Sequence, residues 1–125
     1  MLLNEPISLA FNAEMQAAAA ARGAGQHAQC MIHLERAHLI GQRAFSWHWR
    51  VHWHMLSLAL NQSDGKEIIG QLIRLSLVPL GHLLGRLPVG NVGSTRMGAF
   101  DTAEMPKDVT DLLAGRSNQV RGPVP

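Results

Sequence analysis

The sequence predicts an all-α protein, a bundle of three to four helices with an extended, irregular C-terminal segment wrapped around it. As far as about Arg86, long stretches have helical periodicity or high helix propensity, and short glycine-rich or polar turns separate them. From Leu87 glycine and proline become frequent and no long helical period remains. A chain of 125 residues is long enough for one domain, which we place at residues 1–115, with a flexible tail at 116–125.

Composition narrows the class of protein. Hydrophobic residues make up 46% of the chain, which is enough to form a core. The balance of 11 Lys+Arg against 9 Asp+Glu is only slightly basic and the arginines are scattered, so we expect no nucleic-acid partner. The single cysteine, Cys30, fits a reducing compartment, and no signal peptide is evident. We therefore expect a cytoplasmic, bacterial protein.

The first helix is predicted from Asn4, a helix-capping residue, to about Arg22. Glu5 and Pro6 suit its first turn, and the alanine-rich sequence that follows has high helix propensity. The glycines at 23 and 25 end it. Glu14 lies on this helix and is a weaker candidate for a second carboxylate at a metal site.

The second helix is predicted from about Gln26 to Arg43, within a stretch that holds six of the seven histidines as far as Asn61. Spacings of three and four residues place one polar stripe on this helix: His27, Met31, Glu35, His38 and Gln42. Within it, Glu35 and His38 form a Glu-x-x-His step, by which a bundle helix offers a carboxylate and an imidazole to one ion. A second such step is absent, which disfavours a symmetric di-iron centre.

The third helix is predicted to follow a corner near residues 44–47, where Ser46 can cap it, and it carries His48 and His52 one turn apart. With Glu35 and His38, these complete a ligand set of three nitrogens and one oxygen, suited to zinc, iron(II) or copper. An unbroken helix would separate His38 from His52 by about 21 Å, so the corner decides whether the site lies within one chain or is shared between two.

Two other interpretations of the same histidines remain open. In the first, the metal is catalytic, with an open position for a small-molecule substrate in an apolar pocket lined by Trp49, Trp53 and Met55. In the second, the histidines are hydrogen-bonded and hold no metal, as single buried histidines usually are. Structural or supporting roles are expected for His33 and His54, and His82 is expected to be a hydrogen-bonded core residue.

The third helix is apolar on nearly every side, and so is the fourth, predicted from about Lys66 to Arg86. Polar residues such as Gln71 and Arg74 argue against a membrane span, and Pro79 predicts a kinked core helix. A membrane-surface helix is a less favoured alternative. Because one wrapping segment is too little to cover both helices, we expect a homo-dimer.

The segment from Leu87 is predicted to be extended, with one short helix near residues 107–114. The glycines at 90 and 93 fit turns better than a phosphate-binding loop, because neither the P-loop lysine nor a preceding strand is present.

Several motifs together resemble a family of small uncharacterised bacterial proteins, classed as a domain of unknown function. They are HLERAH at 33–38 followed by Gly41-Gln42, then His48, His52 and the Trp53–Leu56 step, GQLIRL at 70–75 and GRLPVGN at 85–91. The resemblance spans about residues 28–113. The resemblance implies that the gene for this protein is of a kind that tends to lie near metal-resistance genes in bacteria. Members often carry a proline just before the position of His48, which favours a helix break there; Trp47 stands in its place here.

Overall fold

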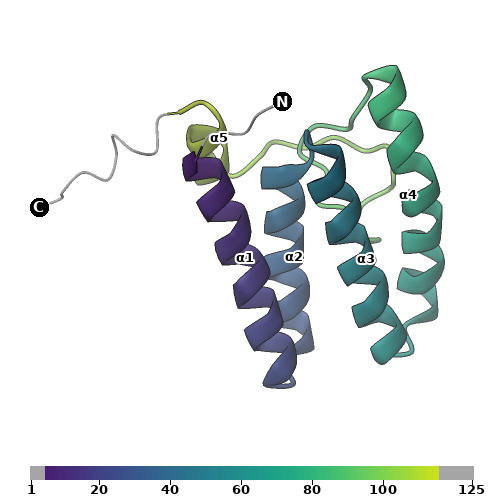
Figure 1. Cartoon of the computed structure of the whole chain (residues 1–125). Helices are drawn as coiled ribbons and strands as arrows, with labels where there is room; N and C mark the ends of the chain where they lie inside the picture. The colour runs from purple at the N-terminus through teal and green to yellow at the C-terminus, as the bar shows by residue number, and fades with distance from the viewer. Residues whose placement is uncertain (1–4, 116–125) are drawn as a thin grey trace, which may run out of the picture.

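The computed structural model describes residues 5–115, which form five helices and no strand. They are α1 (Glu5–Gly23), α2 (His27–Gly41), α3 (Phe45–Asn61), α4 (Gly65–Leu84) and α5 (Lys107–Leu113). Helices α1 and α2 form one antiparallel hairpin and α3 and α4 another, and α2 packs against α3 to join them (Figure 1). The predicted all-α fold is confirmed, and the expected helix boundaries lie within about two residues of those observed.

Helix α1 packs one face against the core. Ile7, Phe11, Met15 and Ala18 recur every three or four residues and are buried, which is the spacing of one helical stripe. Gly25, at φ +76°, adopts the left-handed conformation that turns the chain into α2. The predicted cap Asn4 lies outside the described residues.

The predicted corner between the second and third helices is confirmed, but it lies at residues 42–44, just before the predicted position, because α2 ends at Gly41 and α3 begins at Phe45. The predicted cap was wrong, because α3 has no side-chain cap and Ser46 already lies inside the helix. A Cβ atom at Gly41 would lie 2.8 Å from Cε1 of Phe11, whose ring stacks on Trp47 at 4.3 Å between centroids. Gly41 thus lets α1 and α3 meet at the end of α2.

Helix α4 begins at a cap made by Asp64, whose carboxylate accepts a hydrogen bond from the backbone N–H of Glu67. It continues through Pro79 and ends before Gly85. By length and composition α4 would be able to cross a membrane, contrary to our expectation. In this fold, however, its polar residues Glu67, Gln71 and Arg74 are buried, and its apolar side chains largely form the outer surface.

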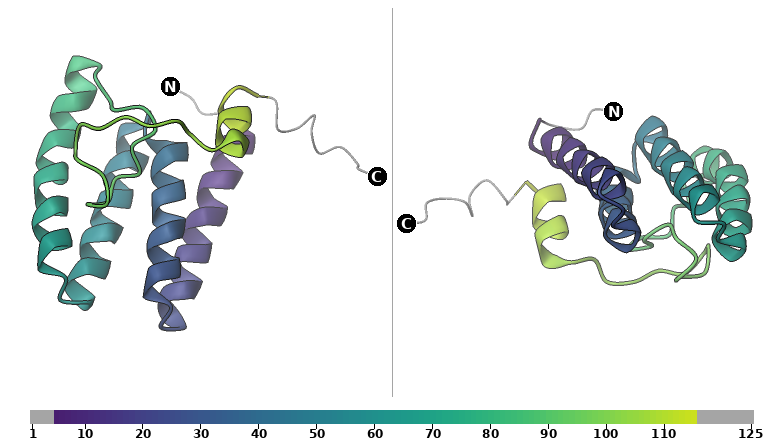
Figure 2. Two further views of the ribbon diagram at one scale, coloured as in Figure 1. Left: turned by 180° about the vertical axis from the view of Figure 1, so that it is seen from behind. Right: turned by 90° about the horizontal axis from the view of Figure 1, so that it is seen from below.

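Residues 85–106 leave the end of α4 and run across one side of the bundle to α5, which packs against α1 and α2 (Figure 2). This is the predicted wrapping segment. Its turns are held internally, since the Asn91 side-chain amide donates to the carbonyl oxygens of Gly98 and Asp101. The tail predicted at 116–125 lies outside the described residues.

Candidate metal centre

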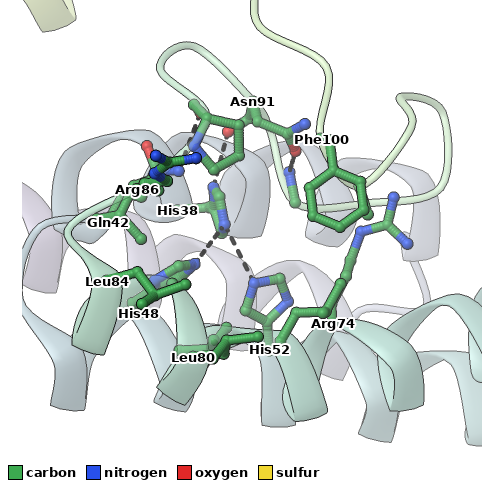
Figure 3. A pocket seen from close by; sticks show the side chains of 17 residues that line it. His38, Gln42, His48, His52, Arg74, Leu80, Leu84, Arg86, Asn91 and Phe100 are labelled. Carbon is green, nitrogen blue, oxygen red and sulfur yellow. Dashed lines mark hydrogen bonds between the residues drawn. The ribbon is translucent and has the colours of Figure 1, made fainter.

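Three histidines meet where α2 and α3 face each other below the wrapping segment (Figure 3). Nε2 of His38 on α2 lies 3.0 Å from Nε2 of His48 and 3.2 Å from Nε2 of His52, both on α3. All three side chains are buried. Two nitrogen ligands of a tetrahedral zinc ion are about 3.3 Å apart, given Zn–N bonds of about 2.0–2.1 Å. The three histidines therefore form a group that could hold one transition-metal ion.

Hydrogen bonds on the far side of two rings fix their tautomers. Nδ1 of His38 lies 2.8 Å from the backbone oxygen of Asn91, and Nδ1 of His52 lies 2.7 Å from Oε1 of Gln71. Oxygen only accepts, and the Gln71 amide nitrogen donates to Glu67, so both Nδ1 atoms must carry the proton. The neutral rings of His38 and His52 are then left with unprotonated Nε2 atoms that face each other.

The outer partner of His48 is a fourth imidazole, that of His82. Nδ1 of His48 lies 2.9 Å from Nε2 of His82 on α4. A proton on His48 Nδ1, donated to His82, leaves His48 Nε2 free as a ligand, like its two neighbours. His82 is half-buried and supports the group from behind.

Burial keeps the three rings neutral. It lowers the pKa of His48 to about 3 and that of His52 to about 4. The pKa of His38 is lowered well below its usual value, first by burial and then by the adjacent His52 and His48 rings. Metal ions bind the neutral form of imidazole, so at neutral pH no proton has to be displaced from Nε2 of His38 or His52.

The wrapping segment reaches the site through a glycine. A Cβ atom at Gly93 would lie 2.5 Å from Cδ2 of His38, and its φ of +89° is a conformation that other residues rarely adopt. This close approach places the Asn91 carbonyl against His38 and the Gly93 carbonyl against the amide of Gln71. The segment thereby orients two of the three histidines.

Glu35, predicted as the fourth ligand, does not lie in the histidine group. Its carboxylate accepts a hydrogen bond from Ser94 Oγ at 2.5 Å and pairs with Arg96. Glu67 on α4 makes the corresponding contact to Thr95, through both the hydroxyl and the backbone N–H. The two buried carboxylates hold the wrapping segment in place, and Glu35 is an anchor beside the site.

The predicted pocket residues Trp49, Trp53 and Met55 do not line a cavity at the histidines. Trp49 and Trp53 border a shallow surface groove on another face of α3, because each follows a site histidine by one residue, about 100° around the helix. Met55 is fully buried, and its sulfur accepts a hydrogen bond from Gln71. These three residues therefore lie apart from the cavity that the histidines line.

A different cavity opens onto the histidines, between α4 and the wrapping segment. It has a volume of about 270 Å³. Figure 3 shows Leu84 and Arg86 to one side of the histidines and Arg74 and Phe100 to the other. Its apolar wall comes mainly from α4 and the segment after it: Leu77, Val78, Leu80, Leu84, Leu87, Pro88 and Phe100.

The remaining candidates of the sequence lie elsewhere. His33 and Arg36 both contact Glu14, so this carboxylate has structural partners. His27 bonds Gln62, and His54 is exposed. Gln42, the last residue of the predicted stripe, lines the cavity and donates to the Pro88 carbonyl.

The supporting residues Gln71, Asn91, Gly93 and His82 were not predicted. Gln71 had a detectable signal, because it is a polar residue on a largely apolar helix. Asn91 acts on His38 through its backbone carbonyl, which leaves no trace in side-chain type. Gly93 was interpreted from the sequence only as a turn residue.

Comparison with known proteins identifies the family of this chain but assigns it no activity. The model of a family described as a protein of unknown function, DUF3703, matches residues 5–113. No curated protein and no solved structure matches the chain. The match takes in all five helices and the histidine group, and the chain belongs to the DUF3703 family.

Proposed function

We propose that this protein binds one transition-metal ion through Nε2 of His38, His48 and His52 and serves in metal handling. The observation that carries the proposal is the approach of two unprotonated Nε2 atoms, on His38 and His52, to 3.2 Å. Two facing lone pairs repel each other unless an electron-pair acceptor lies between them. A metal ion meets that need, and outer hydrogen bonds to ligand imidazoles are typical of metal sites.

Neutral imidazole ligands suit zinc, copper and iron(II). Three protein ligands also leave at least one position for another donor, as in catalytic zinc sites, whereas structural zinc sites are closed by four. The cavity beside the histidines favours a second candidate function, a metal-dependent enzyme acting on a small molecule. A helical module without metal is the alternative against which both are tested.

The test is metal content after purification without an affinity tag and reconstitution with zinc, copper or iron(II). We expect about one ion per chain, and loss of that ion in His38→Ala, His48→Ala and His52→Ala. The matched control is His54→Ala, an exposed histidine on the same helix. Circular dichroism shows whether each variant is folded. A folded wild-type protein that retains no metal contradicts the proposal.

A further inference from the structure

No negatively charged side chain lines the cavity at the histidine group to balance the charge of a divalent metal ion. The three rings are neutral, and two arginines that line the same cavity, Arg74 and Arg86, are permanently charged. The two buried carboxylates nearby, Glu35 and Glu67, do not line the cavity and are engaged with residues 94–96. A metal ion bound here would have no anionic ligand from residues 5–115.

Arg74 is itself only partly satisfied. It is 8% exposed and forms no direct ion pair within the described part of the chain, although the Glu67 carboxylate lies close enough to act on its charge. Its terminal nitrogens donate to the carbonyl oxygens of Gly70, Ser94 and Met97, while its buried Nε has no hydrogen-bond partner there. Buried cations are normally paired, so an anion in the cavity would complete both the arginine and the metal.

The cavity also limits the shape of that anion. Beyond the histidines and Arg74, its wall includes the polar side chains of Gln42, Arg86 and Asn91. The rest of the wall is largely apolar, with Leu80 and Leu84 from α4 and Phe100 from the wrapping segment. An inorganic ion would satisfy the charge but leave these side chains in contact with water. A ligand with one anionic end and a short apolar chain fits both parts.

We propose that a small organic monocarboxylate is the further ligand of this site, with its carboxylate on the metal beside Arg74 and its apolar chain against Leu80, Leu84 and Phe100. The proposal rests on the proposed metal site and names the ligand class that this site accepts. The same ligand class is expected whether the carboxylate is carried together with the metal or is the substrate of a metal-dependent enzyme. Carboxylate coordination forms one dative bond to the metal and displaces bound water.

The test uses the full-length chain loaded with cobalt(II), whose visible absorption reports its ligands. Acetate, propanoate and butanoate are titrated in turn, with butanamide as the uncharged counterpart of butanoate and inorganic phosphate as the anion without a chain. We expect the carboxylates to change the spectrum with an affinity that rises about three- to fourfold per methylene group. Butanamide and phosphate should have much weaker effects.

Variants separate the two ends of the ligand. Leu84→Ala should weaken butanoate binding several-fold and leave acetate unchanged, whereas Leu83→Ala, exposed and outside the cavity, should change neither. Arg74→Gln should weaken all carboxylates alike. Because Arg74 also supports the wrapping segment, the leucine pair provides the decisive comparison if that variant does not fold.

The outcomes are distinct. A cobalt spectrum that butanoate does not change, or that butanamide changes equally, overturns the carboxylate proposal and leaves the metal site standing. Affinity that does not depend on chain length, or that phosphate matches, overturns the assignment of the apolar cavity. A chain that binds no cobalt overturns both the metal site and its ligand.

Discussion

At the scale of single residues, the buried histidines link stability to pH. His48 and His52 have pKa values of about 3 and about 4 in the folded chain, against 6.5 ordinarily. Below pH 6.5 the unfolded chain therefore takes up protons that the folded chain does not, and folding becomes less favourable as pH falls towards 4. Each histidine costs about 1.4 kcal/mol per pH unit in this window.

We predict that the metal-free protein loses stability steeply between pH 6.5 and pH 4, measured as the free energy of unfolding in urea. His52→Asn should have a shallower dependence, because one shifted group is removed. Saturating zinc should raise stability most at neutral pH, where protons do not compete for Nε2. A metal-free protein of constant stability across this window would show that the rings are not held neutral.

A substitution at Glu35 distinguishes a residue that binds the metal from one that only holds the wrapping segment in place. Its carboxylate accepts hydrogen bonds from Ser94 and Arg96. Glu35→Gln should therefore lower the free energy of unfolding by about 1–3 kcal/mol, the range for losing a charged hydrogen bond, while the metal content stays at that of the wild type. A folded Glu35→Gln protein without metal would show that the carboxylate binds the ion, as its Glu-x-x-His spacing had suggested.

At the scale of elements, α4 orients the His52 ring of α3 through the side chain of Gln71. Its side-chain oxygen accepts from His52, and its amide donates to Glu67 and Gly93. Gln71→Leu should weaken zinc binding by about 10- to 100-fold, which is typical for the loss of an outer partner of a ligand histidine. Competition with a chelating dye measures this change.

Gln62→Leu is the matched control for Gln71→Leu, because Gln62 also bonds a histidine, His27, but outside the histidine group. Its zinc affinity should equal that of the wild type. Equal weakening in the two variants would mean that the effect is not specific to the site.

The wrapping segment approaches His38 at Gly93. Gly93→Ala introduces both a strained φ and an overlap with the imidazole. Gly25→Ala introduces the strain alone, since nothing lies near the added Cβ. Both variants should lose about 1–3 kcal/mol of stability, but only Gly93→Ala should lose metal affinity. Denaturant unfolding and zinc competition check the two effects, and normal affinity in Gly93→Ala would contradict a supporting role for this segment.

The sequence predicts the helices better than it predicts which side chains contact one another between them. Helical spacing places His38, His48 and His52 correctly because each lies on a regular helix and the corner at Gly41 reverses the chain. The same stripe includes Glu35, but spacing cannot reveal that the Glu35 carboxylate accepts a hydrogen bond from Ser94, 59 residues away, and lies outside the histidine group. An apolar α3 has no clear face, which explains why Trp49 and Trp53 were misplaced.

At the scale of the whole molecule, the outer face of α4 is apolar and uncovered. Ile69 and Leu83 are 62% and 81% exposed, and Leu72 and Ile73 are half exposed. Among the described helices α4 packs chiefly against α3, and it forms one edge of the bundle (Figure 1). A large exposed apolar patch on a folded protein usually marks an interface or a membrane surface.

We expect this face to join two copies of the chain in a twofold dimer, the commonest symmetric assembly. Light scattering at micromolar concentration should give twice the chain mass of 13.6 kDa. Ile73→Lys should give the monomer without loss of metal, because Ile73 does not line the cavity, whereas Ile32→Lys, at an exposed position on α2, should leave the dimer intact. A monomeric wild type would contradict the dimer, and its sedimentation with anionic lipid vesicles would then identify α4 as a membrane-surface helix.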